Sequence, residues 1–176
     1  MRKLSHAEIV ARQEKQLPEK RLPFTIILNN IRSLYNVGSI FRTADGVGVE
    51  KIWLCGITGH PPHQQITKTA LSAENHVPWE YSQDIRRVLK HLRERHYQIV
   101  LLEQTNESRP YNEFKPCVPV SLIIGNEIEG ASETILSFCD EAIDIEMAGL
   151  KNSLNVAVAF GIVAYDIRYK LITAAR

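Results

Sequence analysis

The chain has 176 residues, of which 44% are hydrophobic and 23% charged, a composition typical of one soluble globular domain. No apolar run approaches the ~20 residues needed to cross a bilayer, and the N-terminal sequence lacks the apolar core of a signal peptide. We therefore expect a cytoplasmic protein with no membrane contact.

The formal net charge of +1 conceals an uneven distribution. Basic side chains outnumber acidic ones six to three in residues 1–21 and five to two in residues 84–95, whereas residues 127–146 carry seven acids and no Lys or Arg. Basic patches of this kind suit a phosphate backbone, although a solvated helix face explains them equally well.

The cysteines and histidines give no sign of a metal site. Cys55, Cys117 and Cys139 are too far apart for a metal knuckle and too few for a disulfide framework, so we expect each to be a small buried side chain in a reducing compartment. The histidines that also lack a ligand spacing are His60, His63, His76, His91 and His96. We expect no metal.

The chain begins with a basic extension, residues 1–23. Ser5 followed by Glu8 has the spacing of a capping box, which predicts a short helix up to about Gln16. Pro18 and Pro23 then indicate irregular backbone before a first strand, which is expected over residues 24–28.

Strands and helices are expected to alternate over the rest of the chain. Val88, Leu89 and Leu92 fall at helical spacing after Ile85, with basic residues on much of the other face. The other expected elements are helices over 36–46, 67–74, 133–138 and 153–173 and strands over 51–55, 98–102, 120–124 and 142–145. This alternation predicts a single α/β domain, with a mostly parallel sheet covered by helices on both faces.

Three blocks place polar residues and glycines after strand-like runs, where open α/β sheets bind ligands. The first, residues 29–45, sets Asn36 and Gly38 at a strand-to-helix junction that favours anions, with Arg42 nearly two helical turns further on. Arg42 suits a surface salt bridge equally well.

The second and third blocks have the same character. In residues 122–130, Gly125 directly follows an apolar strand and allows a ligand close to the backbone, but the dinucleotide-binding glycine fingerprint is missing. In residues 143–159, Asn152, Ser153 and Asn155 cluster where the last helix is expected to open, and Ser153 also suits a helix cap. Three such blocks in one small chain indicate a composite site.

Together the blocks resemble the SpoU (TrmH-like) family of RNA ribose 2′-O-methyltransferases, in the SPOUT superfamily. The resemblance covers about residues 24–169, because the N-V-G…F-R-T-A, G-N-E-x-x-G and S-L-N-V segments occur in the family's order and spacing. It implies a methyltransferase domain over residues 24–176 with a C-terminal trefoil knot. It further implies S-adenosyl-L-methionine bound within the knot and a homodimer joined through the last helix.

The resemblance also assigns site residues. The sequence departs from the family's pattern at two positions, with Glu146 where the family usually has proline and Ala157 where serine is common. The residues that match cofactor-binding positions are Gly125, Ile145 and Leu154, supported by Met147, Gly149, Ser153 and Glu127. The residues that match the polar catalytic group are Asn36, Arg42, Glu127 and Asn155.

The implied reaction is methyl transfer to a ribose 2′-hydroxyl. Arg42 is an awkward base because its pKa exceeds ~12, so a role in stabilising the alkoxide and holding an RNA phosphate fits better. Asn36 and Asn155 would orient the ribose and Arg42, with Glu127 fixing one of these donors. The RNA is expected to be transfer RNA, with a guanosine in a loop, rather than ribosomal RNA, recognised by the N-terminal arm, the 86–95 helix and the partner subunit.

Two other functions remain open. A knotted RNA-binding or ribosome-assembly module without catalysis would fail to bind S-adenosylmethionine. A methyltransferase of the same superfamily that modifies a base would be distinguished by analysis of the product nucleoside.

Overall fold

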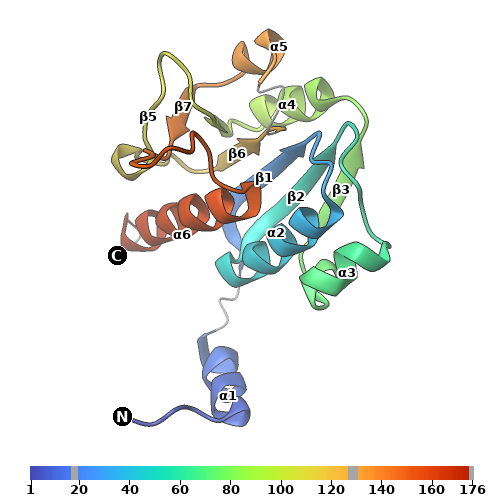
Figure 1. Cartoon of the computed structure of the whole chain (residues 1–176), viewed down its shortest axis with the longest axis vertical. Coiled ribbons are helices and arrows are strands. Elements are labelled where there is room, and N and C mark those ends of the chain that lie inside the picture. The colour runs from blue at the N-terminus through green and yellow to red at the C-terminus, as the bar shows by residue number, and fades with distance from the viewer. Residues whose placement is uncertain (17–19, 127–130, 175–176) are drawn as a thin grey trace.

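The computed structural model describes residues 1–16, 20–126 and 131–174. Seven parallel strands form one sheet in the order β3-β2-β1-β6-β4-β7-β5 (Figure 1). The strands are β1 (Leu22–Asn29), β2 (Val49–Cys55), β3 (Trp79–Ser82), β4 (Gln98–Leu102), β5 (Arg109–Pro110), β6 (Val120–Ile124) and β7 (Glu141–Asp144). The helices are α1 (His6–Gln16), α2 (Leu34–Val47), α3 (Gln64–Ala70), α4 (Ile85–Glu94), α5 (Glu133–Leu136) and α6 (Val156–Ala174), with short 3-10 turns η1 (Ala73–Asn75) and η2 (Tyr111–Glu113).

Both faces of the sheet are covered, as the alternation of elements predicts. In β1, Ile26 and Leu28 contribute to the core beneath α2, α3 and α6, whereas Ile27 contributes to the core beneath α4 and α5. Central strands of a parallel sheet are buried on both faces, which is why β1 and β6 are runs of apolar residues rather than alternating ones. The single α/β domain with a parallel sheet is confirmed.

The N-terminal helix α1 stands apart from the sheet domain (Figure 1). Its capping box forms as expected, because the Ser5 amide donates to Glu8 at 2.8 Å and the Glu8 amide donates to the Ser5 hydroxyl at 3.3 Å. Arg2 also pairs with the Glu8 carboxylate. These contacts are local, so α1 has the means to form as an independent arm.

Several expected element bounds are wrong. The helix expected over 67–74 divides into α3 and η1 because Leu71 and Ser72 have positive φ angles of 51° and 73°. The last helix begins at Val156 rather than at residue 153. The sequence pattern also misses β3 and β5, which are short edge strands with exposed residues.

The cysteines are only partly as expected. Cys55 is buried, Cys139 is half-buried and Cys117 is exposed, and all three thiols are free.

Within the described ranges, no helix is both long and apolar enough to span a bilayer.

Candidate functional site

The three sequence blocks meet at the carboxyl edge of the sheet. They follow β1, β6 and β7, whose last residues are Asn29, Ile124 and Asp144. The strand order reverses between β1 and β6, since β2 and β3 extend to one side and β4 and β7 to the other. Such a switch point, with loops leaving in opposite directions, is where open parallel sheets bind ligands.

A cavity of about 380 Å³ lies at the ends of β4, β6 and β7. Apolar side chains such as Ile124 and Val156 and polar ones such as Gln104 and Asp144 line it together. Five residues expected to bind a cofactor line this cavity, namely Gly125, Ile145, Met147, Ser153 and Leu154. We refer to it as the main cavity.

Gly149 lies beside the main cavity rather than in it. It lines an adjoining hollow that shares Ile145 and Met147 with the main cavity. Glu146 also faces this hollow, so the acidic replacement is not part of the main cavity's lining. Ala157 packs, partly buried, against the core beneath α6.

A second cavity of about 180 Å³ opens on the other side of β6. Asn126 and Val156 line both cavities and therefore form the wall between them. The other lining residues of this second cavity are Asn30, Ile31, Arg32, Ser33 and Asn36. Two ligands, one in each cavity, would lie next to each other on either side of this wall.

Asn36 and Asn155 are brought together although 119 positions separate them in the sequence. The Asn155 amide Nδ2 donates to Asn36 Oδ1 at 3.2 Å. Asn155 Oδ1 in turn accepts from the Ala157 amide at 3.0 Å, while Ser33 caps α2 by accepting from the Asn36 amide at 3.3 Å. The cap of α6 is therefore Asn155, and the possible capping role of Ser153 is wrong.

Arg42 lies on α2, after Asn36, with its side chain exposed. It makes no hydrogen bond or ion pair with the residues that the structure describes, so the salt bridge considered from the sequence does not form there. The guanidinium is available to a ligand. Glu127 lies outside the described residues.

Sequence reasoning missed several polar residues of the cavities, among them Arg32, Gln104 and Asn126. Arg32 and Asn126 stand inside the first and second blocks, so their place after β1 and β6 was a usable signal. Gln104 had no such signal, because it follows β4 outside all three blocks. Its side chain donates to the Asn152 carbonyl at 2.8 Å and steadies the loop before α6.

Among residues 1–16, 20–126 and 131–174, no cluster of three or more His, Cys, Asp or Glu side chains could hold a metal ion. The lining of the two cavities includes side-chain amides, the Arg32 guanidinium and backbone groups. These groups hold and orient polar ligands and stabilise anions.

Comparison with known proteins supports this architecture. The profile of the SpoU rRNA Methylase family matches residues 23–165, most of the chain. The chain belongs to the SpoU family. A TrmH family tRNA/rRNA methyltransferase of Staphylococcus saprophyticus is 30% identical over 162 residues, which is 92% of this chain and 65% of that protein.

Two further similar proteins match this chain over more than four fifths of their own length. The tRNA (guanosine(18)-2′-O)-methyltransferase of Thermus thermophilus is 29% identical over 93% of this chain and 83% of its own. The crystal structure of an A. aeolicus TrmH/SpoU tRNA modifying enzyme has a TM-score of 0.82 and 25% identity, covering 96% of this chain and 85% of that one. The overall fold is therefore that of a SpoU domain.

Proposed function

We propose that the protein is an S-adenosylmethionine-dependent methyltransferase that acts on a ribose 2′-hydroxyl of RNA. The observation that carries the proposal is the pair of cavities that share Asn126 and Val156, with the Asn36–Asn155 hydrogen bond beside them. A methyl donor on one side and a ribose on the other would be neighbours, as an in-line transfer requires.

The main cavity suits the methyl donor. Its volume of about 380 Å³ falls within the range of small-molecule sites, and its lining mixes apolar and polar groups. Apolar residues such as Leu154 and Ile145 offer contact to an adenine ring, while Gly125 leaves the backbone accessible. Gly149 and Ser153 support the loop that closes the cavity, and S-adenosylmethionine supplies the methyl group when bound there.

Polar groups in and beside the second cavity position the ribose, since Asn36 lines that cavity and Asn155 is hydrogen-bonded to Asn36. Asn36 and Asn155 hold the sugar hydroxyls, and their mutual hydrogen bond fixes both amides. Arg42 stabilises the negative charge that develops on the 2′-oxygen and contacts an RNA phosphate, because a guanidinium stays protonated at neutral pH. Glu127 orients one of these donors.

RNA recognition rests on basic surfaces outside the cavities. On α4 the side chains of Arg86, Arg87, Lys90 and Arg93 are exposed, and α1 carries further basic residues. We favour tRNA, with a guanosine in a loop, over rRNA, and the Thermus relative named as a tRNA guanosine methyltransferase supports this choice. The basic extension 1–23 then serves as an RNA-binding arm of the methyltransferase domain 24–176.

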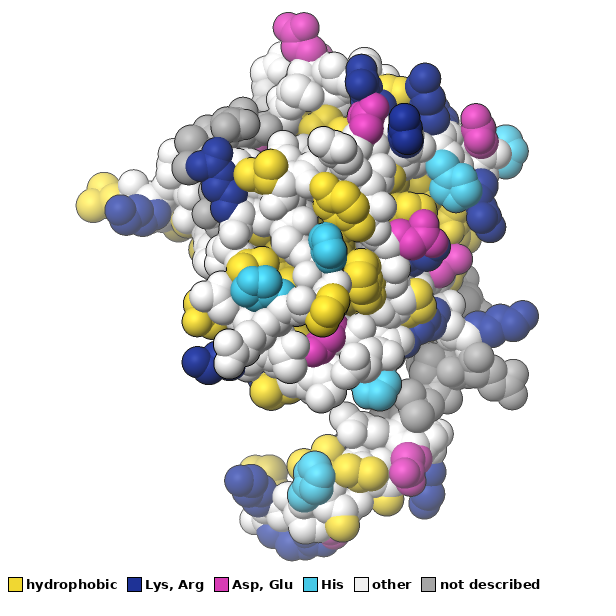
Figure 2. Space-filling view, turned by 90° about the vertical axis from the view of Figure 1, so that its right-hand side faces the viewer, with side chains coloured by type: hydrophobic (Ala, Val, Ile, Leu, Met, Phe, Trp, Pro, Cys, Tyr) yellow, Lys and Arg dark blue, Asp and Glu magenta, His cyan; other side chains and the backbone are white. Residues whose placement is uncertain are grey.

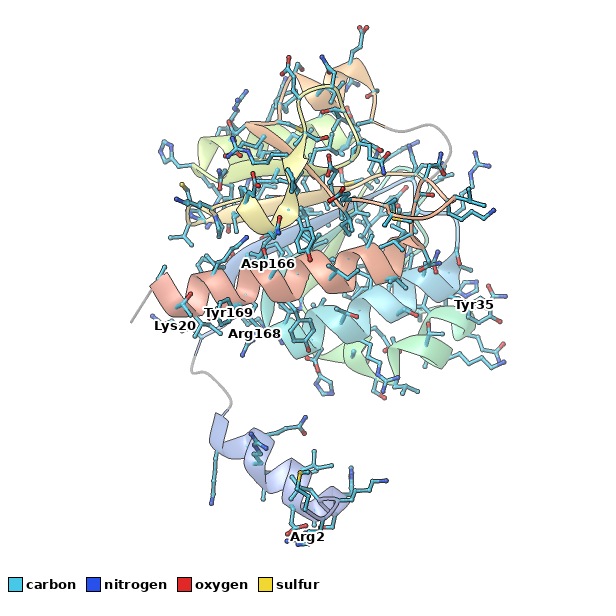
Figure 3. The ribbon with its side chains drawn as sticks, turned by 60° about the vertical axis from the view of Figure 1, so that its left-hand side comes forward. Arg2, Lys20, Tyr35, Asp166, Arg168 and Tyr169 are labelled. Carbon is cyan, nitrogen blue, oxygen red and sulfur yellow. The ribbon has the colours of Figure 1, made fainter. Side chains whose placement is uncertain are left out.

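A homodimer through α6 is part of the proposal. Val158, Ile162, Tyr165 and Tyr169 recur at helical spacing and are 53%, 37%, 52% and 70% exposed. Tyr169 projects from the C-terminal part of α6 (Figure 3). A continuous apolar stripe of this kind suits burial against a second copy.

The family resemblance also supports a trefoil knot formed by the segments around the main cavity. A cytoplasmic location agrees with three free thiols and with the position of RNA substrates in the cell.

A base-modifying methyltransferase and an inactive RNA-binding module are the alternatives. The paired amides of Asn36 and Asn155 favour a sugar hydroxyl over a ring nitrogen, and the open main cavity favours a bound cofactor over an inactive module. In the same assay the base-modifying alternative predicts a methylated base, and the inactive module predicts no methylated product.

The test is methyl transfer from labelled S-adenosylmethionine to separate pools of unmodified tRNA and rRNA, followed by digestion to nucleosides and mass analysis. A 2′-O-methylnucleoside from one pool is expected and identifies the substrate class. A methylated base would support the base-modifying alternative. Absence of both transfer and cofactor binding would refute the enzyme.

A further inference from the structure

An exposed cluster of rings lies at the β3 edge of the sheet, outside both cavities. The His60 imidazole stacks with Trp79, with ring centroids 5.9 Å apart and an interplanar angle of 20°. Tyr81 packs against the same imidazole with centroids 5.0 Å apart. We call His60, Trp79 and Tyr81 the aromatic platform.

The platform faces solvent. His60 is exposed and Tyr81 is 44% exposed, whereas Trp79 is half-buried and packs against the core with its outer part beside His60. Figure 2 looks onto the side of the domain that carries α3 and β3, and hydrophobic and histidine side chains gather at the centre of this face. Large exposed rings of this kind are more often a contact surface than an accident of packing.

The platform is joined to the substrate side of the proposed active site. The loop between β2 and α3 carries His60, and its Ile57 amide donates to Asn30 Oδ1 at 3.1 Å. The buried Thr58 hydroxyl accepts from the Ile31 amide at 3.0 Å. Asn30 and Ile31 line the second cavity, so one hydrogen-bonded loop connects the two places.

The charge around the platform permits an RNA strand. Strand alternation turns Glu80, between Trp79 and Tyr81, to the opposite face of the sheet. There its carboxylate pairs with Lys51 at 2.6 Å, so the negative charge of Glu80 points away from the platform and is neutralised. RNA bases that leave a helix are held mainly by stacking on aromatic and histidine rings.

We propose that the aromatic platform binds an unpaired base of the RNA substrate, next to the nucleotide whose ribose is methylated. This inference rests on the proposed RNA methyltransferase function and adds to it a surface, outside both cavities, that holds an unpaired base beside the methylated nucleotide. Stacking does not depend on base identity, so the platform selects unpaired structure rather than sequence.

The test compares binding of a short fluorescein-labelled single-stranded oligoribonucleotide with binding of the same sequence as a duplex, by fluorescence anisotropy. Tyr81→Ala and His60→Ala are expected to weaken single-strand binding about 10-fold each and to leave duplex binding unchanged. Tyr81→Phe is the matched control, because it keeps the ring and removes only the hydroxyl that donates to the Gly56 carbonyl at 2.8 Å.

A second readout does not depend on the stability of these variants. The chain has two tryptophans, so Trp53→Phe leaves Trp79 as the only one. Binding of the single strand is expected to quench Trp79 fluorescence, and the duplex is not. Unchanged fluorescence at saturating single strand would overturn the proposal.

Other results separate the platform from the methyltransferase. Equal losses in Tyr81→Phe and Tyr81→Ala would mean that the hydroxyl merely anchors the loop, which overturns stacking. Unaltered RNA affinity with a changed sedimentation coefficient would identify a protein contact and also overturn it.

If wild-type protein shows platform-dependent RNA binding but binds no S-adenosylmethionine, the platform stands and the methyltransferase fails. If the Ala variants keep normal methyl transfer and normal RNA affinity, the methyltransferase stands and the platform fails.

Discussion

Arg42 is the exposed side chain that we propose stabilises the developing charge on the ribose 2′-oxygen. It follows Asn36 on α2 and has no partner among the described residues, while Asn36 is already fixed by Asn155. A guanidinium free of intramolecular ion pairs costs little to place on a developing alkoxide or a phosphate.

Arg42→Ala is expected to lower kcat by roughly 100- to 1,000-fold, as the loss of one oxyanion donor does elsewhere. The affinity for S-adenosylmethionine should be unchanged, because Arg42 does not line the main cavity. Single-turnover methylation and calorimetric cofactor binding measure the two effects. Arg109→Ala, which removes an exposed arginine on β5, is the control, and near-normal turnover of Arg42→Ala would refute the assigned role.

The three cysteines differ in their surroundings and should differ in reactivity. Burial, with a smaller contribution from the Asp84 charge, raises the pKa of Cys55 to about 12, and burial followed by the Asp140 charge raises the pKa of Cys139 to about 11. The thiolate is the reactive species, so neither thiol reacts readily below these values.

At pH 8 iodoacetamide is expected to modify the exposed Cys117 and to spare Cys55 and Cys139. Reactivity of Cys55 and Cys139 should rise only as the pH approaches their raised pKa values or when the protein unfolds. Peptide mass mapping of the native and the urea-unfolded protein checks this, and rapid native labelling of Cys55 would contradict the packing described.

At the scale of elements, α2 depends on one glycine for its approach to α3. A Cβ on Gly38 would overlap the Thr69 hydroxyl and the Ile66 carbonyl oxygen. Glycine normally weakens a helix interior by about 1 kcal/mol relative to alanine, so its presence here is explained by this close contact.

Gly38→Ala is therefore expected to destabilise the fold by about 1–3 kcal/mol, despite the better helix propensity of alanine. Urea unfolding followed by circular dichroism measures the change. Asp45→Ala, exposed on the same helix, should alter stability by no more than about 0.5 kcal/mol. A stabilising Gly38→Ala would mean that α2 and α3 lie further apart than described.

The apolar stripe on α6 makes a second prediction for an element. Tyr165→Glu would place an unpaired charge at the centre of the proposed dimer contact, where its desolvation opposes association. Analytical ultracentrifugation is expected to show a dimer for the wild type and a shift towards monomer for this variant.

Leu136→Glu, on α5 beneath the opposite face of the sheet, serves as the control and should leave the dimer intact. A wild-type protein that remains monomeric at high concentration would refute the dimer itself.

On the scale of the whole molecule, a net charge of +1 hides surfaces suited to RNA. On α4, Arg86 pairs with Asp84 and Arg93 with Asp140, whereas the exposed Lys90 makes no ion pair with the described residues. Arg87 is also exposed and makes no ion pair with the described residues, so Arg87 and Lys90 are the two basic side chains of α4 most available to a phosphate.

Lys90→Glu is expected to weaken tRNA binding several-fold and to lower the slope of log Kd against log salt by about 1, the loss of roughly one phosphate contact. Filter binding over a range of salt concentrations measures both quantities. Lys115→Glu changes the net charge equally at an exposed position before β6, and an equal effect from it would indicate a general charge effect instead of a contact by α4.

The sequence by itself determined most of the helices and strands and the three blocks that follow the strands. These features depend on local patterns, such as the buried run of β1, the periodic apolar residues of α4 and the capping box of Ser5 and Glu8. Even there, β3 escaped notice, because an edge strand of four residues with a half-exposed pattern gives too weak a signal.

Only the tertiary structure decided which distant residues meet. The hydrogen bond between Asn36 and Asn155 exists because α6 packs against α2, which brings the start of one helix next to the start of the other, and no local pattern encodes that pairing. The aromatic platform likewise depends on the loop after β2 folding over the edge strand β3, which brings His60 onto Trp79 and Tyr81. Such contacts depend on how loops close over a packed sheet, a property of the whole chain that no short segment carries.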